Sequence, residues 1–401
     1  MTSGEVRVIR RQWWVWAIVA LVVVVAVAPL VYTWLTNPDD QRLVDLDVYR
    51  TGGQMLLDGR PVYDYVTPAP QLLPFTYPPV AAMLAVALAG MSWGTAQWVW
   101  TAGIFVALAV TVGFSFRGVL GREELRKYAP WVFGALMVAC AYLMPIRDQV
   151  RFGQVDILLV ALCLVDVVAR RPWWPRGFLI GLATAVKLTP GVFLIYLLVT
   201  RQWRTFFMAA FAAAVLTLLP FAVIPQDAAG FWFSALLDPE RLGANAATTN
   251  QSIRGMLIRL YMPDLLTFAI WAVIVAAVGW YGFRGARDAY KAGDSVTAVA
   301  LVGLMAVLLS PVAWIHHLAW VVVVLAAIVG DGRDPVRLRV AAGVWLFYVV
   351  PVPWWGVSLK AADIPGVSLV LGKIVQNGFG LGALALVWLL VSWLPKRRNL
   401  A

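Results

Sequence analysis

Long apolar runs, separated by short polar segments, constrain this chain more than any other feature of its sequence. The first run, from Trp13 to about Leu35, is long enough to cross a membrane core, which takes about 20 residues. It is too long for the core of a signal peptide and has no small-residue cleavage site, so it predicts an uncleaved first span. Eleven more apolar runs follow, at about 77–91, 95–115, 129–145, 153–169, 177–200, 205–225, 264–283, 294–311, 313–330, 339–353 and 375–395.

The composition supports a membrane protein. Of the 401 residues, 62% are hydrophobic and 13% are charged, whereas soluble proteins average about 45–50% apolar and about 25% charged residues. This excludes a soluble enzyme, a disordered chain and a secreted disulfide scaffold. The two cysteines, Cys140 and Cys163, lie in apolar runs, which argues against a disulfide framework or a Cys-based metal site. We therefore expect an all-α polytopic membrane protein whose single domain, a transmembrane helical bundle, covers residues 1–401.

The charge distribution predicts the orientation in the membrane. The net charge of +11 comes from Lys and Arg in short loops between apolar runs, so it indicates topology first and contact with anionic membrane lipids second, and no nucleic acid. Both chain ends are basic, so both termini are expected in the cytoplasm. Segment 36–76 holds six aspartates against three arginines and is expected to be the first outer loop. Segment 226–263 is then the second outer loop.

Two basic loops, at 116–128 and 170–176, conflict with twelve complete crossings because they would fall outside. The conflict disappears if runs 77–91 and 177–200 do not cross fully. The second of these carries Lys187 at its centre, and interrupted helices survive in membranes only where protein or a wet cavity satisfies the freed backbone groups. We predict ten to twelve membrane helices and favour broken segments.

The candidate catalytic base lies in the first outer loop, in the sequence Leu43-Val-Asp-Leu-Asp-Val-Tyr-Arg50. Asp45 and Tyr49 are four residues apart, so a helix would present them on one face, whereas Asp47 would diverge from Asp45. An aspartate at the outer membrane surface can act as a general base for a hydroxyl nucleophile. The alternative is a solvated loop carboxylate or a helix cap.

Ionisable residues close to apolar runs are candidate anion ligands, because they are costly in a membrane unless they are paired or face a cavity. Lys187 lies about ten residues from either end of its run, and Pro190 follows it. Its natural partner is a lipid phosphate or a carboxylate. Segment 147–156 contains Arg151 and Gln154; structural pairing of its arginines with its aspartates is the alternative there.

Two further motifs suit sugar or phosphate binding. Asn250-Gln-Ser-Ile-Arg254 offers amides and an arginine, which match sugar hydroxyls and phosphate, although a simple surface loop explains it equally well. In Phe75-Thr-Tyr-Pro-Pro79, proline favours an extended start to the next segment, and a plain helix N-terminus is the alternative.

The only two histidines, His316 and His317, are adjacent within an apolar run and lie between tryptophans. Neighbouring residues on a helix point about 100° apart, and no Cys or Glu lies nearby, so a zinc site is not expected. A clamp on a phosphate or pyrophosphate is the favoured interpretation. A core histidine bonded to the backbone is the alternative for one of the pair.

Together these groups predict an outward-facing site that combines a carboxylate with cations at membrane depth. Transfer of a group from a lipid phosphate needs this combination, because cations stabilise the departing phosphate and the carboxylate activates the acceptor hydroxyl. No metal is required in principle.

The order of motifs resembles glycosyltransferase family 87, whose members are membrane mannosyl- and arabinosyltransferases of the GT-C type. The motifs are Asp-x-Asp-Val-Tyr, Tyr-Pro-Pro, Gly-Gln, Lys-x-x-Pro, Asn-Gln-Ser, Ser-Pro and His-His, between about residues 40 and 320. Within the family the chain looks most similar to actinobacterial α-mannosyltransferases of phosphatidylinositol mannosides. One departure is Ile315, where some relatives carry a polar residue before the His pair.

The resemblance implies a polyprenyl-phosphate mannose donor, a glycolipid acceptor, no nucleotide sugar and no cofactor. It implies that the base is the aspartate four residues before Tyr49, which is Asp45, and that one displacement inverts the anomeric carbon from β to α. Attack by O-2 of an acceptor mannose is expected. The residues expected to bind the donor phosphate are Lys187, Arg151, Arg254, His316 and His317. The residues expected to bind substrate are Asp47, Tyr49, Arg50, Tyr77, Gln154, Asn250 and Gln251.

Several different functions fit the same residues. A transporter or flippase of polyprenyl-linked sugars would also use broken helices and a buried lysine, but it would not need a large acidic outer loop. A non-catalytic scaffold of the cell envelope also fits, as do a lipomannan-branching enzyme and an arabinosyltransferase of the same family. For the enzyme we expect a multi-pass protein of the plasma membrane whose active site faces the extracytoplasmic side.

Overall fold

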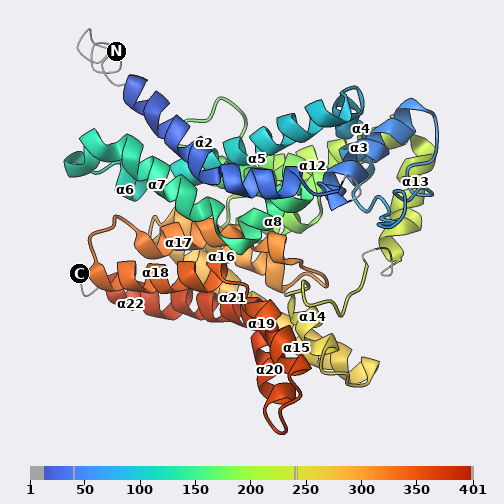
Figure 1. Ribbon diagram of the computed structural model, residues 1–401. Coiled ribbons are helices and arrows are strands. Elements are labelled where there is room, and N and C mark those ends of the chain that lie inside the picture. Colours follow the sequence, from blue (N-terminus) through green and yellow to red (C-terminus); the bar gives the residue numbers. More distant parts are fainter. Residues whose placement is uncertain (1–12, 39–40, 239–240, 242, 399–401) are drawn as a thin grey trace.

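The computed structural model, shown in Figure 1, describes residues 13–38, 41–238, 241 and 243–398. The described part is helical and contains no β-strand, only two isolated bridges, Val66 with Pro74 and Asn250 with Trp314. The predicted all-α polytopic architecture is therefore confirmed. The basic N-terminal end, on which the cytoplasmic placement of that terminus depends, lies outside the described residues.

Five helices of the described chain are long and apolar enough to cross a membrane. They are α2 (Trp13–Leu35), α5 (Trp93–Ser115), α12 (Trp203–Val223), α15 (Asp264–Lys291) and the C-terminal stretch Gly378–Arg397, which comprises α21 (Gly378–Trp388), the π-helical η7 (Leu389–Trp393) and most of α22 (Leu394–Arg398). Two bent pairs raise the number to seven if each is one span. They are η2–α7 (Glu123–Tyr128, Ala129–Ala141) with α8 (Met144–Phe152), bent by 74°, and α18 (Pro335–Val349) with α19 (Val352–Ala361), bent by 53°.

The remaining helices are shorter. The apolar ones are α4 (Pro79–Ala89), η3–α11 (Thr189–Gly191, Val192–Val199), α16 (Ser295–Leu308) and η6–α17 (Ile315–Trp320, Val321–Val329). The others are α3 (Val44–Leu57), α6 (Arg117–Leu120), α9 (Asp156–Val168), α10 (Phe178–Val186), α13 (Pro225–Phe233), η4 (Ala235–Leu237), α14 (Ile253–Ile258) and α20 (Ser368–Gln376). Ten to twelve crossings require the short apolar helices to cross as well, so that number stays a prediction.

The centre of the bundle is formed by α16 and α17. All residues of 297–308 and of 321–328 are buried, as expected for helices that are apolar on every side. At Gly303 on α16 a β-carbon would lie 2.3 Å from the ring of Trp320, so glycine is needed for this close approach. The contact fixes η6, which carries both histidines, against the most deeply buried helix.

The run 177–200 is broken, as predicted. Helix α10 ends at Val186, Lys187 is extended with φ −150° and ψ 131°, and η3 and α11 follow. Pro190 explains the break, because it has no backbone N–H to donate to the carbonyl of Val186 four residues earlier. The break turns the lysine side chain out of a regular helix and leaves it at the wall of a cavity.

Both predicted outer loops contain helices of their own. Helix α3 occupies much of 36–76, and α13, η4 and α14 occupy parts of 226–263. Figure 1 shows α3, α4 and α13 gathered at one end of the molecule, whereas the first turns of α2 and the end of α22 lie at the other. This arrangement supports the expectation that both segments lie on one side of the membrane, opposite the C-terminus.

Candidate active site

A cavity of about 1020 Å³ opens at the end of the bundle formed by these two segments. Its walls come from the start of α3, the segment before α4, the end of α8, the break after α10, the α13–η4 region and the segment that leads into η6. Six predicted site residues line it: Asp45, Tyr77, Gln154, Lys187, His316 and His317. The carboxyl of Asp45, the ammonium of Lys187 and the two imidazoles therefore frame one chamber, as the sequence predicts.

Asp45 lies in the first turn of α3, which is not one of the candidate membrane spans. Burial raises the pKa of its carboxyl to about 7, while a hydrogen bond with Gln154 and the positive charge of Lys187 act in the opposite direction. A carboxyl that titrates near neutral pH is well matched to take a proton from a hydroxyl group. Asp47 does not line the cavity, so the two aspartates diverge as predicted, but Asp47 does not lie where it was expected to bind substrate.

Gln154 connects Asp45 to two tyrosines. The hydroxyl of Tyr49 donates to Gln154 Oε1 over 3.0 Å and lies 2.8 Å from the hydroxyl of Tyr77, which is 3.3 Å from the same oxygen. Gly153 ends α8 with φ 74°, and a β-carbon there would lie 2.7 Å from that of Leu46. The Gly-Gln motif thus lets α8 approach α3 closely enough for the amide to meet the carboxyl.

Lys187 belongs to a buried ion pair. Its Nζ donates to Asp156 Oδ1 over 2.7 Å and lies 3.0 Å from Nε2 of His317. Nε2 of His316 and Nε2 of His317 each lie 3.9 Å from an oxygen of the same carboxylate. The ammonium also lies 5.3 Å from the centre of the Tyr77 ring. This group offers an anion one ammonium and two imidazoles at the wall of the cavity.

Sequence reasoning missed Asp156 as a site residue. The signal was present, since an aspartate at the start of an apolar run requires a partner in the same way as a lysine inside one. Asp156 and its partner Lys187 are 31 positions apart, and only the packing of α9 against α10 brings them together.

The expectation that the adjacent imidazoles diverge is wrong. Residues 315–320 form a 3₁₀-helix, and the two ring centroids lie 4.7 Å apart with both Nε2 atoms towards Asp156. Donor atoms of Asp156, His316 and His317 lie within 4.8 Å of one another, a set that can ligate a metal ion. However, Nζ of Lys187 contacts two of the three groups, so a divalent ion would have to displace an ammonium. The arrangement suits an anion ligand better than a metal site.

Asn250 and Gln251 were predicted to bind substrate, but the structure gives their polar atoms protein partners. Both are completely buried. The backbone N–H of Ala313 donates to Asn250 Oδ1. The backbone N–H of Gln251 donates to the carbonyl of Ala313. The amide of Gln251 donates to the carbonyls of Thr248 and Gln376. These residues hold the segment before η6 in place and so position the histidines, which is a different role from the predicted one.

Three predicted arginines also lie away from the cavity walls. Arg151 is exposed, with its guanidinium 5.0 Å from the centre of the Phe152 ring. Arg50 donates to the carbonyl of Met91 over 3.0 Å, and Arg254 lies half-buried on α14. The arginine that does line the cavity is Arg241, which the sequence did not single out because no motif surrounds it.

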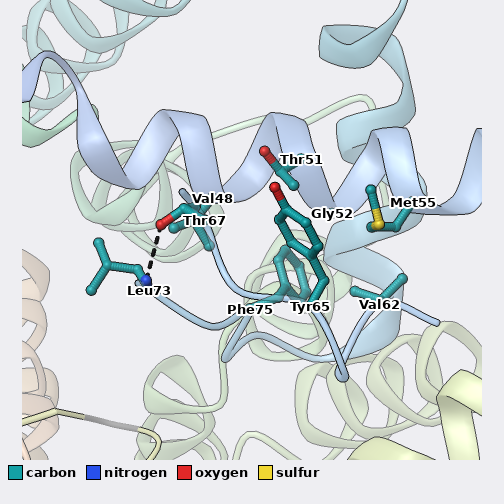
Figure 2. A pocket seen from close by; sticks show the side chains of 9 residues that line it. All are labelled: Val48, Thr51, Gly52, Met55, Val62, Tyr65, Thr67, Leu73 and Phe75. Carbon is teal, nitrogen blue, oxygen red and sulfur yellow. Dashed lines mark hydrogen bonds between the residues drawn. The ribbon is translucent and has the colours of Figure 1, made fainter. Parts of the chain in front are cut away.

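Figure 2 shows a second, much smaller pocket between α3 and the segment 62–75. Its volume of about 10 Å³ is close to one water molecule, so it is too small for a substrate. The backbone N–H of Leu73 donates to Thr67 Oγ1 over 2.9 Å, and the ring of Phe75 packs at Gly52. The pocket therefore marks the contact that holds this wall of the large cavity against α3.

Comparisons with known proteins identify the family. Residues 75–311 match glycosyltransferase family 87. The chain is 36% identical to a protein of Mycolicibacterium smegmatis named polyprenol-phosphate-mannose-dependent alpha-(1-2)-phosphatidylinositol mannoside mannosyltransferase, over 77% of this chain and 76% of that one. A protein of Mycobacterium tuberculosis with the same name is also 36% identical, with the same coverage.

A second M. smegmatis protein, named for a phosphatidylinositol pentamannoside acceptor, is 32% identical over 83% of this chain and 81% of its own length. No solved structure matches the chain. The family match covers more than half of the sequence, and the curated relatives extend over most of it. The chain therefore belongs to glycosyltransferase family 87 and is a membrane glycosyltransferase.

Proposed function

We propose that this protein transfers mannose from polyprenol-phosphate mannose to O-2 of a mannose on a phosphatidylinositol mannoside, with Asp45 as the general base. The observation that carries the proposal is that Asp45 and the Lys187–His317 group line the same cavity. The donor, the acceptor and the α-(1-2) linkage follow the names of the relatives. Because the phosphoinositol acceptor is a lipid, both substrates reach the cavity from the membrane.

The reaction is a single displacement. The acceptor oxygen attacks the anomeric carbon of the donor mannose, and its proton passes to the carboxylate of Asp45. The bond between that carbon and the phosphate oxygen breaks, and its electron pair leaves with polyprenol phosphate. A β-linked donor gives an α-linked product. Lys187 and His317 stabilise the charge that develops on the leaving phosphate, which is where preorganised donors contribute most.

Sidedness follows from the same proposal. The cavity lies among the two predicted outer segments, the first of which is acidic, so on this proposal it faces the extracytoplasmic side of the plasma membrane and both termini are cytoplasmic. The aspartate-rich segment 36–76 and the basic residues that follow the last span support this orientation.

The test uses purified protein in detergent with polyprenol-phosphate mannose and a phosphatidylinositol mannoside, and product is detected by mass. The wild type should add one mannose that an α-(1-2)-specific mannosidase removes. Asp45→Asn should lower the rate by about 10²–10⁴-fold, since it removes the proton acceptor. Asp58→Asn, which changes an exposed aspartate of the same segment, should leave the rate unchanged and serves as the matched control.

Two results would contradict the proposal. If Asp47→Asn abolishes transfer and Asp45→Asn does not, the base is misassigned. If the wild type forms no product but moves the lipid-linked sugar across proteoliposome membranes, the protein is a transporter.

A further inference from the structure

Arg241 is a second cation at the cavity, on a wall that the proposed mechanism does not use. It lines the cavity just after η4. Its Nη2 donates to the carbonyls of Tyr63 (2.7 Å) and Phe75 (3.4 Å). In the described part of the chain its hydrogen-bond partners are these carbonyls, and no carboxylate pairs with it. Within the described residues, two backbone carbonyls thus hold the guanidinium in place and no carboxylate neutralises its charge.

Lys187 differs in this respect, because Asp156 pairs with it at 2.7 Å. The two cations also belong to different parts of the cavity wall, Lys187 to the break after α10 and Arg241 to the segment after η4. The charge of Lys187 acts on the carboxyl of Asp45. A cavity of about 1020 Å³ therefore contains one cation that acts on the proposed base and a second cation on another wall.

The surroundings of Arg241 fit a lipid. The preceding helices expose Phe233 (74%) and Leu237 (72%), and Leu236 is both 41% exposed and part of the cavity wall. In a membrane protein such side chains face acyl chains, and a basic residue next to them lies at the depth of lipid headgroups. An apolar surface that leads to an arginine matches a molecule with hydrocarbon chains attached to a phosphodiester.

We propose that Arg241 binds the phosphodiester of the lipid acceptor, while the Lys187 group binds that of the donor. The inference rests on the proposed function. The donor phosphate is bonded to the reacting anomeric carbon, so its ligand must lie close to the reacting atoms, across that carbon from the base. Lys187 lines the same cavity as Asp45, and its charge acts on the carboxyl of Asp45. The acceptor phosphodiester is separated from the reacting hydroxyl by inositol and sugar rings, so its ligand must lie elsewhere in the cavity.

The experiment compares two acceptors for wild type, Arg241→Gln and Arg241→Lys. One is a phosphatidylinositol mannoside and the other an uncharged alkyl α-mannoside. Arg241→Gln should raise KM for the anionic acceptor by about ten- to a hundredfold, the effect of losing a charge-assisted hydrogen bond. It should leave the KM values for the donor and the uncharged acceptor unchanged, and Arg241→Lys should recover most of the loss. Arg60→Gln, which changes an exposed arginine of the first outer segment, is the matched control.

Equal losses with both acceptors would show that Arg241 only braces Tyr63 and Phe75, and would overturn the proposal. A rise in the donor KM would do the same. Binding of phosphatidylinositol to protein in nanodiscs gives a readout that needs no turnover: Arg241→Gln should weaken it, and unchanged binding would also overturn the proposal. Failure of the wild type to transfer mannose to either acceptor would instead count against the proposed function.

Discussion

At the scale of single residues, the proposed chemistry depends on the half-buried position of Asp45 at the cavity wall. An exposed aspartate is too weak a base near neutral pH, whereas the burial of Asp45 raises the pKa of its carboxyl to about 7. Efficient general bases have pKa values close to the working pH. The charge of Lys187 opposes the shift, so the ammonium that we propose as a ligand of the donor phosphate also favours the ionised form of the proposed base.

The raised pKa predicts a pH dependence. Asp45 accepts a proton only in its ionised form, so kcat/KM for the acceptor should fall about tenfold per pH unit below pH 7 and level off above it. A rate profile between about pH 5.5 and 8.5 measures this directly. The residual activity of Asp45→Asn should not show this fall at low pH. A fall in the wild-type rate with a midpoint near the ordinary aspartate pKa of about 4 would contradict the assignment.

At the scale of elements, α3 positions the base through close helix packing. At Gly53 a β-carbon would lie 2.5 Å from the backbone carbonyl of Ala85 on α4. These are main-chain atoms, which cannot turn aside as the end of a long side chain can. The two helices can therefore approach this closely only with glycine at position 53, two turns along α3 from Asp45.

We expect Gly53→Ala to destabilise the protein by about 1–3 kcal/mol, the usual cost of overpacking, and to lower activity because α3 moves. Thermal unfolding in detergent, followed by tryptophan fluorescence, measures the first effect. Gly103→Ala is the control, since Gly103 lies inside α5 and a β-carbon there would have no neighbouring atom within 4 Å outside the helix's own backbone. That variant should be as stable as the wild type or more so. Equal stability of Gly53→Ala and the wild type would show that α3 and α4 can separate at little cost.

At the scale of the whole molecule, the orientation in the membrane can be tested with cysteines. Cys140 and Cys163 are buried, so they contribute little background with a membrane-impermeant maleimide. Asp58 lies in the first predicted outer segment and Asp288 near the C-terminal end of α15, and both are exposed. In intact cells Asp58→Cys should be labelled, and Asp288→Cys only after permeabilisation. The reverse pattern would place the cavity in the cytoplasm.

Much of this organisation could be predicted from local sequence. The apolar runs identify an all-α membrane protein, and Pro190 explains why the run around Lys187 is broken. Because side-chain direction in a helix repeats every 3.6 residues, the four-residue spacing puts Asp45 and Tyr49 on one face, and the two-residue spacing puts Asp47 on another. Each of these predictions depends on neighbours along the chain.

Contacts between distant residues were decided by the tertiary structure. Lys187 meets Asp156 and His317, which are 31 and 130 positions away. The side chain of Asn250 accepts a hydrogen bond from the backbone N–H of Ala313, a residue 63 positions away. Packing of distant elements also places Arg241 at the cavity and Arg151 outside it. Hydrophobic periodicity specifies which face of a helix is buried. The side chains that this face contacts depend on which other helix packs against it, and that pairing is a property of the whole fold.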